Sequence, residues 1–454
     1  MGNSSSVPLG RYFGGTNRAE ALSSGTKSHF RAGRSLNGGN EFVPAKSGYT
    51  VGLRTEARMT NLELAATLPA GDFASDISPA VDRVQWFVLA GVVAVTSITF
   101  GLYWDISWHQ TIGRDTFWTP AHLAIHFGGI LAAITCTYLI FSTTFAHNAP
   151  ARAASVGVWG FHGPLGAFLT AWGGATMLTS APFDNWWHNS FGLDVEILSP
   201  PHVVLGLGIL GVGVGSLLVL VAQMNRSSGE ARKKLGRLFL YLAGLLIVLH
   251  LILLSEDCDA TAMHSSIFYK MMTFGTPLLL VAFARASGRR WGATIIASIY
   301  MAFMLAGLWI FPMFPAVPKL GPVFTNVTHM VPMGFPVLLI FPAIALDVVL
   351  NRFADRNRWL QAAIAGSAFL GVLLIVHWPW ANFMISPAAR NAFFGQNYFP
   401  YAFPPSMYHL AWEFQHSDAT RGAFLLGLGL AWIFAIVSCR IGLQFGDKLV
   451  HLQR

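Results

Sequence analysis

Residues 84–122 read VQWFVLAGVVAVTSITFGLYWDISWHQTIGRDTFWTPAH, and this stretch decides the fold. Its first part, 84–104, carries no charge and is about 20 residues long, which is enough for one helix to cross a bilayer. If that helix runs on, Asp105 and His109 lie on one face, one turn apart. The stretch therefore predicts a membrane helix whose end carries a pair of metal-ligand side chains.

A second helix is predicted to begin just after this pair. Thr119 and Pro120 are typical of an N-cap and a first helical residue, which puts His122 in the first turn. The same arrangement occurs again, because Asp184 and His188 are followed by the helix start Ser199-Pro200-Pro201 and by His202. Each unit thus combines one carboxylate and two imidazoles at converging helix ends.

The composition is that of a membrane protein. Hydrophobic residues make up 54% of the 454 residues and charged residues only 11%, against about 25% charged in soluble domains. The net charge of +8 would suggest nucleic acid in a soluble chain, but here Lys and Arg lie in short loops between apolar runs, and no nucleic-acid partner is predicted. The three cysteines form no Cys-x-x-Cys motif and imply no disulfide framework.

Apolar runs of bilayer-spanning length recur along the chain. They cover 84–104, 119–145, 156–179, 201–223, 236–254, 267–284, 292–312, 331–350, 359–378 and 422–443. The predicted fold is therefore all-α, a polytopic transmembrane bundle of about ten helices. Residues 1–80 are rich in Gly, Ser, Asn and Arg and lack an apolar period, so they are predicted to form a disordered or loosely attached cytoplasmic tail.

The charges of the loops predict the orientation. The loops at 146–155, 224–235, 285–291 and 351–358 are basic, whereas the loops between them are acidic or neutral. By the positive-inside rule both termini are cytoplasmic and the chain crosses the cell membrane, inner or plasma, several times. The two ligand units then lie at the outer face.

One carboxylate and two imidazoles suit a divalent transition metal. The same ligands are used by non-haem iron oxygenases, and imidazole-rich sites equally suit copper or zinc, so ligand type alone leaves the metal open. An isolated Asp-x-x-x-His is more often a capping or packing pair. Its repetition with a matching helix start favours metal binding, because ionisable residues at membrane depth are costly.

The spacings resemble a known family. Asp105-x3-His109-x12-His122 and Asp184-x3-His188-x13-His202 are similar to the two copper sets of the C subunit of the particulate methane and ammonia monooxygenases. The resemblance implies copper bound by Asp105, His109 and His122 in one site and by Asp184, His188 and His202 in the other, and a catalytic role for these six residues.

The resemblance has limits. The family typically has Asn where this chain has Asp184, and it offers no counterpart for His126, one turn after His122. The resemblance is sharp over about 84–220 only. We expect His126, Arg114 and Asp115 to act as outer partners of the ligands rather than as ligands.

The second half shows a looser resemblance to the A subunit of the same enzymes. The cues are Trp291-Gly292-Ala293-Thr294, the Leu346-Asp347 pair and the aromatic stretch 395–400. They imply a C-subunit-like membrane domain over 81–284 joined to an A-subunit-like one over 285–454. Nothing in the chain resembles the cupredoxin-bearing B subunit.

The function that this resemblance implies is a membrane-bound, copper-dependent monooxygenase, or a subunit of one, that oxidises a small apolar molecule such as methane or a short alkane, or ammonia, with O2. It implies a soluble cupredoxin-like partner on the outer face, a separate electron donor and a hetero-oligomer. The competing interpretation is a membrane protein that transports or handles copper or another transition metal. A transporter should carry polar residues through the bilayer middle, and the apolar runs have few.

Overall fold

The computed structural model describes eight stretches of the chain: 82–113, 116–145, 149–153, 155–191, 199–255, 258–319, 327–397 and 405–454, without the side chains of 149, 150, 188 and 405–408. The predicted tail over 1–80 lies outside these residues, as do Arg114 and Asp115. The described residues belong to one compact unit of the chain.

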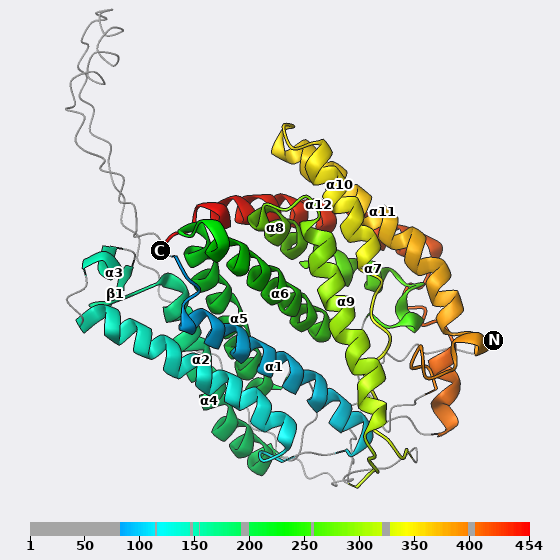
Figure 1. Ribbon diagram of the computed structural model, residues 1–454. Coiled ribbons are helices and arrows are strands. Elements are labelled where there is room, and N and C mark those ends of the chain that lie inside the picture. The colour runs from blue at the N-terminus through cyan, green and yellow to red at the C-terminus, as the bar shows by residue number, and fades with distance from the viewer. Residues whose placement is uncertain are drawn as a thin grey trace, which may run out of the picture. The chain divides into compact units, whose positions relative to one another are not determined.

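Helices account for nearly all of the secondary structure described, as the sequence predicts (Figure 1). The elements are α1 (Trp86–Thr111), α2 (Pro120–Phe145), α3 (Ala149–Ala153), β1 (Val156–Val158), β2 (Phe161–Gly163), α4 (Leu165–Phe191), α5 (Pro200–Asn225), α6 (Gly229–Leu253), η3 (Ala260–Ala262), α7 (Ser266–Thr273), α8 (Thr276–Ser287), α9 (Gly292–Ile310), η4 (Phe311–Met313), α10 (Ile340–Arg352), α11 (Arg358–Met384), η5 (Pro387–Ala389), η6 (Pro405–Trp412) and α12 (Arg421–His451).

Eight helical spans among the described residues are long and apolar enough to cross a bilayer. They are α1, α2, α5, α6, α7 with α8, α9 with η4, α11 and α12. The chain is therefore an all-α polytopic bundle, and the predicted fold class is confirmed.

The other two predicted spans begin later than expected. Residues 156–163 form an antiparallel hairpin, and helix α4 starts only at Leu165. The two turn residues of the hairpin, Trp159 and Gly160, have φ of 52° and 84°, the left-handed values that a two-residue hairpin turn requires. The apolar run continues across this turn, which is why hydropathy alone extended the helix too far.

The predicted span at 331–350 is helical only from Ile340, and α10 has 13 residues. The preceding residues have no regular secondary structure and are largely buried, with Val331 2% exposed. Pro332 and Pro336 lack the N–H groups that a helix needs and restrict the residues before them. The backbone of Val331 instead bonds to α1: its C=O accepts from Ser107 Oγ at 2.5 Å, and its N–H donates to Thr111 Oγ1 at 2.7 Å.

Glycines let α1, α2, α4 and α5 approach closely. A Cβ on Gly101 of α1 would lie 2.8 Å from Ile125 Cγ1 of α2. On α4, a Cβ at Gly173 would lie 2.5 Å from the Val212 nitrogen of α5, and one at Gly174 would lie 2.7 Å from the Gly129 oxygen of α2. Helix α2 therefore packs between α1 and α4, and α4 packs on α5.

The predicted boundary at 284/285 runs through packed helices. Helix α8 lies along α12, and α6 contacts α9. Two of the three cues for the second domain meet each other, because the buried Asp347 carboxylate of α10 accepts from the Ala293 and Thr294 nitrogens at 3.0 and 2.8 Å and so caps α9. The division into a C-like and an A-like domain stays a prediction.

Basic loops gather at one end of the bundle. Arg285 and Arg358 both pair with Asp447 near the end of α12, the latter at 3.4 Å. Asn225, at the end of α5, donates from Nδ2 to the Leu449 and Leu452 oxygens at 2.8 Å. Three of the loops that the charge pattern assigned to one side thus meet the end of α12.

Candidate metal centre

The first unit lies at the end of α1, which continues to Thr111 and so carries both predicted ligands on its last turns. The Asp105 Oδ2 and His109 Nε2 atoms are 3.8 Å apart. The two side chains are 16% and 26% exposed, so they lie in a half-buried setting. The prediction that Asp105 and His109 share one helix face is confirmed.

Helix α2 brings the second imidazole to the same carboxylate. It begins at Pro120, as predicted, and the Thr119 carbonyl accepts from the Leu123 N–H at 3.0 Å. The Thr119 hydroxyl accepts from the Thr116 N–H at 2.9 Å, which fixes the loop that enters the helix. His122 in the first turn then places Nε2 3.2 Å from Asp105 Oδ1.

The second unit repeats this geometry on α4 and α5. Helix α4 extends to Phe191, beyond the predicted end of the span at 179, so Asp184 and His188 lie on its last turns; the side chain of His188 is outside the described part. Ser199 is the N-cap of α5 with Pro200 after it, as predicted. His202 Nε2 lies 3.8 Å from Asp184 Oδ1.

His126 lies beside the first unit. Its ring centroid is 6.5 Å from that of His122, one turn earlier on α2, and 5.4 Å from that of Phe117. Because α2 contacts α1 on one side and α4 on the other, the two units are neighbours across α2.

The donor atoms fit a transition metal in part. Two ligand atoms each about 2.1 Å from one ion lie roughly 3 to 4 Å apart, and the 3.2 and 3.8 Å separations around Asp105 fall in that range. The Asp105 Oδ1 atom is buried and lies 3.2 Å from His122 Nε2. No group of three His, Cys, Asp or Glu among the described residues meets the full geometry of a metal site. The described side chains therefore form carboxylate–imidazole pairs, and each pair could supply two of the ligands of a metal ion.

Sequence reasoning missed the residues that fix the end of α1. Ser107 and Thr111 are four apart on the helix and hold the backbone of Val331, as described above. The Lys319 N–H also donates to the Ile112 oxygen at 3.0 Å. The i,i+4 spacing of two hydroxyl side chains was a signal, but their partner is more than two hundred residues away in sequence.

Two later histidines have structural partners. The Leu338 N–H donates to His377 Nε2 at 3.0 Å, so Nδ1 carries the proton and donates to the Leu373 oxygen at 3.0 Å. His250 Nε2 lies 3.0 Å from Thr276 Oγ1. His250 connects α6 to α8, and His377 connects α11 to the segment before α10.

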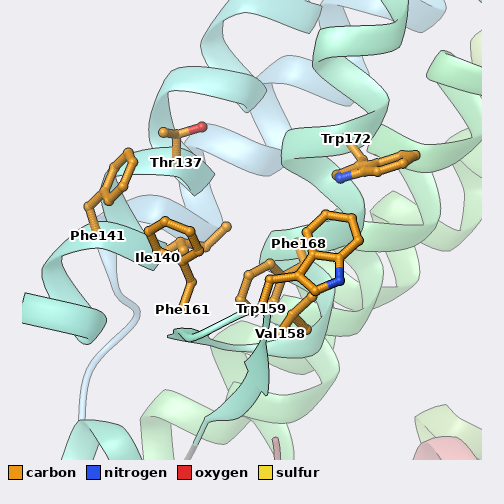
Figure 2. Close-up of a pocket in the computed structure, with 8 residues that line it drawn as sticks. All are labelled: Thr137, Ile140, Phe141, Val158, Trp159, Phe161, Phe168 and Trp172. Atoms are coloured by element: carbon orange, nitrogen blue, oxygen red, sulfur yellow. The ribbon is translucent and has the colours of Figure 1, made fainter.

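A pocket of about 450 Å³ opens far from the ligands, between α2, the hairpin and α4 (Figure 2). Its walls are almost wholly apolar and largely aromatic, and they are formed by Thr137, Ile140, Phe141, Val158, Trp159, Phe161, Phe168 and Trp172. Thr137 is fifteen residues beyond His122 on the same helix, which corresponds to roughly 22 Å. The pocket therefore does not contain the metal-ligand residues.

Compared with known proteins, the chain matches no family model, no curated protein and no solved structure. The geometry of the two units and the spacing of their residues are what bear on function.

Proposed function

We propose that the chain is a membrane-bound, copper-dependent monooxygenase, or a subunit of one, acting with O2 on a small apolar substrate such as methane or a short alkane, or on ammonia. The observation that carries the proposal is the Asp105 carboxylate, whose two oxygens face imidazole nitrogens at 3.2 and 3.8 Å and whose Oδ1 atom is buried. A carboxylate with this environment is suited to a cation.

In this proposal Asp105, His109 and His122 hold one copper ion, and Asp184, His188 and His202 hold the other. Bound copper would supply the activation of O2, which the amino-acid side chains alone do not provide. The chain's own contribution is to hold the ligands on four closely packed helix ends and to leave a coordination position open. Six ligands on helix ends are held more precisely than ligands on mobile loops.

Aromatic side chains lie next to the ligand residues of both units and add apolar surface there. Phe117 and Trp118 lie at the start of α2, with ring centroids 4.8 Å apart. Phe183 and Trp186 stack beside Asp184 on α4, with centroids 5.9 Å apart. A small apolar molecule partitions into such surroundings, whereas a large polar substrate would lose its hydration there.

The proposal includes partners. Copper chemistry with O2 needs electrons, and we propose that a separate donor provides them through a soluble, cupredoxin-like subunit at the outer face of the cell membrane. The described segments that connect the spans contain one short hairpin and no strand-rich domain that would serve instead. We therefore propose a hetero-oligomer with both termini of this chain in the cytoplasm.

The test is metal analysis of the purified chain together with O2-dependent product formation in membranes. Wild-type protein should contain copper, and its membranes should oxidise methane, a short alkane or ammonia. Copper binding without O2-dependent oxidation, even with the other subunits present, would favour metal transport or handling. Iron or zinc in place of copper would reject the copper assignment but keep the site.

A further inference from the structure

The aromatic pocket between α2, the hairpin and α4 is bordered by a hairpin that is fixed to the end of α2 (Figure 2). The His162 N–H donates to Thr144 Oγ1 at 2.8 Å, and the same hydroxyl lies 3.2 Å from the His162 oxygen. Gly163 packs closely on α2, because a Cβ there would lie 3.1 Å from Ile140 Cγ1. These contacts make the pocket a preformed feature of the fold.

Trp159, in the turn of the hairpin, has a backbone conformation that is unusual for its residue type. Its φ of 52° is a value that non-glycine residues seldom adopt, and the first position of such a turn favours Asn or Gly. Trp159 is 83% exposed, and its ring lines the pocket with its centroid 6.4 Å from that of Trp172 (Figure 2). Non-glycine residues in sparsely populated backbone conformations cluster at ligand sites. The conformation of Trp159 therefore points to a ligand of the indole outside the chain.

The walls of the pocket select the class of ligand. Apart from two indole N–H groups, Thr137 supplies the only polar side-chain group among the lining residues, so a ligand with several carbonyl or hydroxyl groups would lose hydrogen bonds there. The ring planes of Trp159 and Trp172 cross at 49°, and those of Phe141 and Phe161 cross at 79°. Parallel faces would suit a rigid flat ring system, whereas a flexible hydrocarbon chain follows walls at different angles. These walls fit a hydrocarbon chain.

The pocket lies close to the end of a membrane span. Thr137 is eight residues before the last residue of α2, Phe145, which corresponds to roughly 12 Å. Helix α3, which follows, packs against α2 and β2 and carries the exposed Arg152. The Ser155 N–H and hydroxyl donate to the Arg152 oxygen at 3.1 and 2.7 Å and fix the chain between α3 and the hairpin. A cationic side chain is thus present at the end of α2, where the phosphate of a lipid would lie.

We propose that this pocket binds one acyl chain of an anionic phospholipid, whose phosphate lies beside Arg152. The bilayer supplies the ligand, because α2 is one of the spans that are long and apolar enough to cross it. Binding within a bilayer depends on van der Waals packing, since the surrounding lipid is as apolar as the pocket. The fixed aromatic walls provide that packing. The inference depends neither on metal binding nor on oxidation.

The experiment uses the full chain, purified in detergent and stripped of lipid. Palmitoyl-oleoyl phosphatidylglycerol is added stepwise, the bound lipid is counted by native mass spectrometry, and the melting temperature is recorded at each step. Trp159→Gly removes the indole and suits the backbone of the turn. Thr137→Phe fills the pocket and keeps Trp159. Ile134→Ala is the matched control, because Ile134 lies on the same helix, is 66% exposed and does not line the pocket.

Wild-type protein should bind the lipid and gain melting temperature with its concentration. Trp159→Gly should weaken binding by roughly three- to tenfold, as expected for one aromatic contact, with little change in the melting temperature without lipid. Thr137→Phe should weaken binding by about tenfold or more, because its ring competes with the chain for space. Arg152→Gln should weaken binding of phosphatidylglycerol by about fivefold and that of phosphatidylcholine less. Ile134→Ala should bind like the wild type.

Several results would overturn the inference. Equal binding by wild type and Trp159→Gly, or an equal loss in Ile134→Ala, would mean that lipid covers the apolar surface without using the pocket. Binding of dihexanoyl phosphatidylglycerol as tight as that of the long-chain lipid would show that the headgroup, not the chain, is held. Displacement of the phospholipid by cholesteryl hemisuccinate would assign the pocket to a rigid ring system. A folded wild-type chain that binds no phosphatidylglycerol would remove the site.

Discussion

At the residue scale, two aspartates organise the site. Asp105 faces an imidazole from its own helix and one from α2, and Asp184 faces one from α5. A half-buried carboxylate is costly unless a cation or a proton compensates it. The ligand residues should therefore differ sharply from their neighbours in what their removal does to metal binding.

His109→Ala and His122→Ala should each abolish metal binding at the first unit, because each removes one of two imidazoles. Asp105→Ala should weaken binding and leave the second unit loaded. His126→Ala should cost less, about 10–100-fold in affinity, since His126 is an outer partner. Bound metal per chain and turnover in all four variants test this. Equal damage from His126→Ala and His122→Ala would point to an iron or zinc centre built on the His-x-x-x-His pair.

Asp347 supports a different prediction, about stability. It is 1% exposed, and its carboxylate accepts from the Ala293 and Thr294 nitrogens and from Thr294 Oγ1 at 2.7 Å. Asp347→Ala would leave these donors unpaired and should lower the free energy of unfolding by about 2–3 kcal/mol. Asp347→Asn keeps one acceptor oxygen, so its free energy of unfolding should lie between those of the wild type and Asp347→Ala. Unfolding by denaturing detergent measures both; equal stability of wild type and Asp347→Ala would refute the cap.

At the element scale, the site depends on how closely the helices approach. Gly101 lies one turn before Asp105 and directly against Ile125 of α2. The distance between Asp105 and His122 is thus set by a glycine contact a few ångströms away. A side chain at this contact would separate α1 from α2 and would enlarge the gap between the ligands.

Gly101→Ala should therefore destabilise the chain by about 1–3 kcal/mol through overpacking and should weaken metal binding at the first unit. Gly206→Ala on α5 is the matched control, because a Cβ there meets no atom within 4 Å. The control should be neutral or up to about 1 kcal/mol more stable, since Ala favours a helix. Similar behaviour of the two variants would contradict the role of the close contact.

His264 predicts a pH dependence for the segment that follows η6. Its ring is stacked between Trp378 and Phe414, with centroids 4.0 and 3.7 Å away, and its Nε2 donates to the Trp378 oxygen at 3.1 Å. Burial lowers the pKa of His264 below its ordinary value, the Trp378 carbonyl opposes this shift, and nearby His416 adds to it. The stacked state thus disfavours the protonated ring.

A lowered pKa in the folded state means that this stabilisation is present above the ordinary pKa of about 6.5 and is lost as the pH falls through the lowered value. The melting temperature should therefore fall between about pH 7.5 and 5.5, and His264→Phe, which keeps the stacking, should show a smaller fall. An equal fall in both proteins would assign the effect to other groups.

Local sequence patterns predicted the elements whose signals lie within a few residues. The run from Trp86 continues helically through Asp105 and His109, and Ser199 with Pro200 marks the start of α5. The non-helical segment around Val331 and the cap of α9 by Asp347 depend on partners far away in sequence, and no local pattern reveals them. The sequence also placed both ligand units at helix ends. It could not show which side chains lie near His126, because that depends on how the chain folds.

At the scale of the whole molecule, the bundle has two chemically different ends. Basic loops and the end of α12 meet through Arg285, Arg358 and Asp447, whereas the ligand units occupy other helix ends. The positive-inside rule then predicts that the ligand units face outward.

Ser190 is exposed near the end of α4, and Ser228 is exposed in a basic loop. In a background without the three buried native cysteines, Ser190→Cys should react with an impermeant maleimide on intact cells, and Ser228→Cys only after permeabilisation. The reverse pattern would invert the topology and remove the outer-face assignment of the site.

The central claim is that Asp105, His109 and His122 bind copper, and the most direct measurement is the nitrogen hyperfine coupling of Cu²⁺ in the purified chain with ¹⁵N-labelled histidine. The prediction is tightly bound copper whose couplings shift with the label and whose first-unit signal disappears in His122→Ala while that of the second unit remains. Folded protein that binds no copper, or copper whose spectrum is the same in wild type and His122→Ala, would contradict the claim.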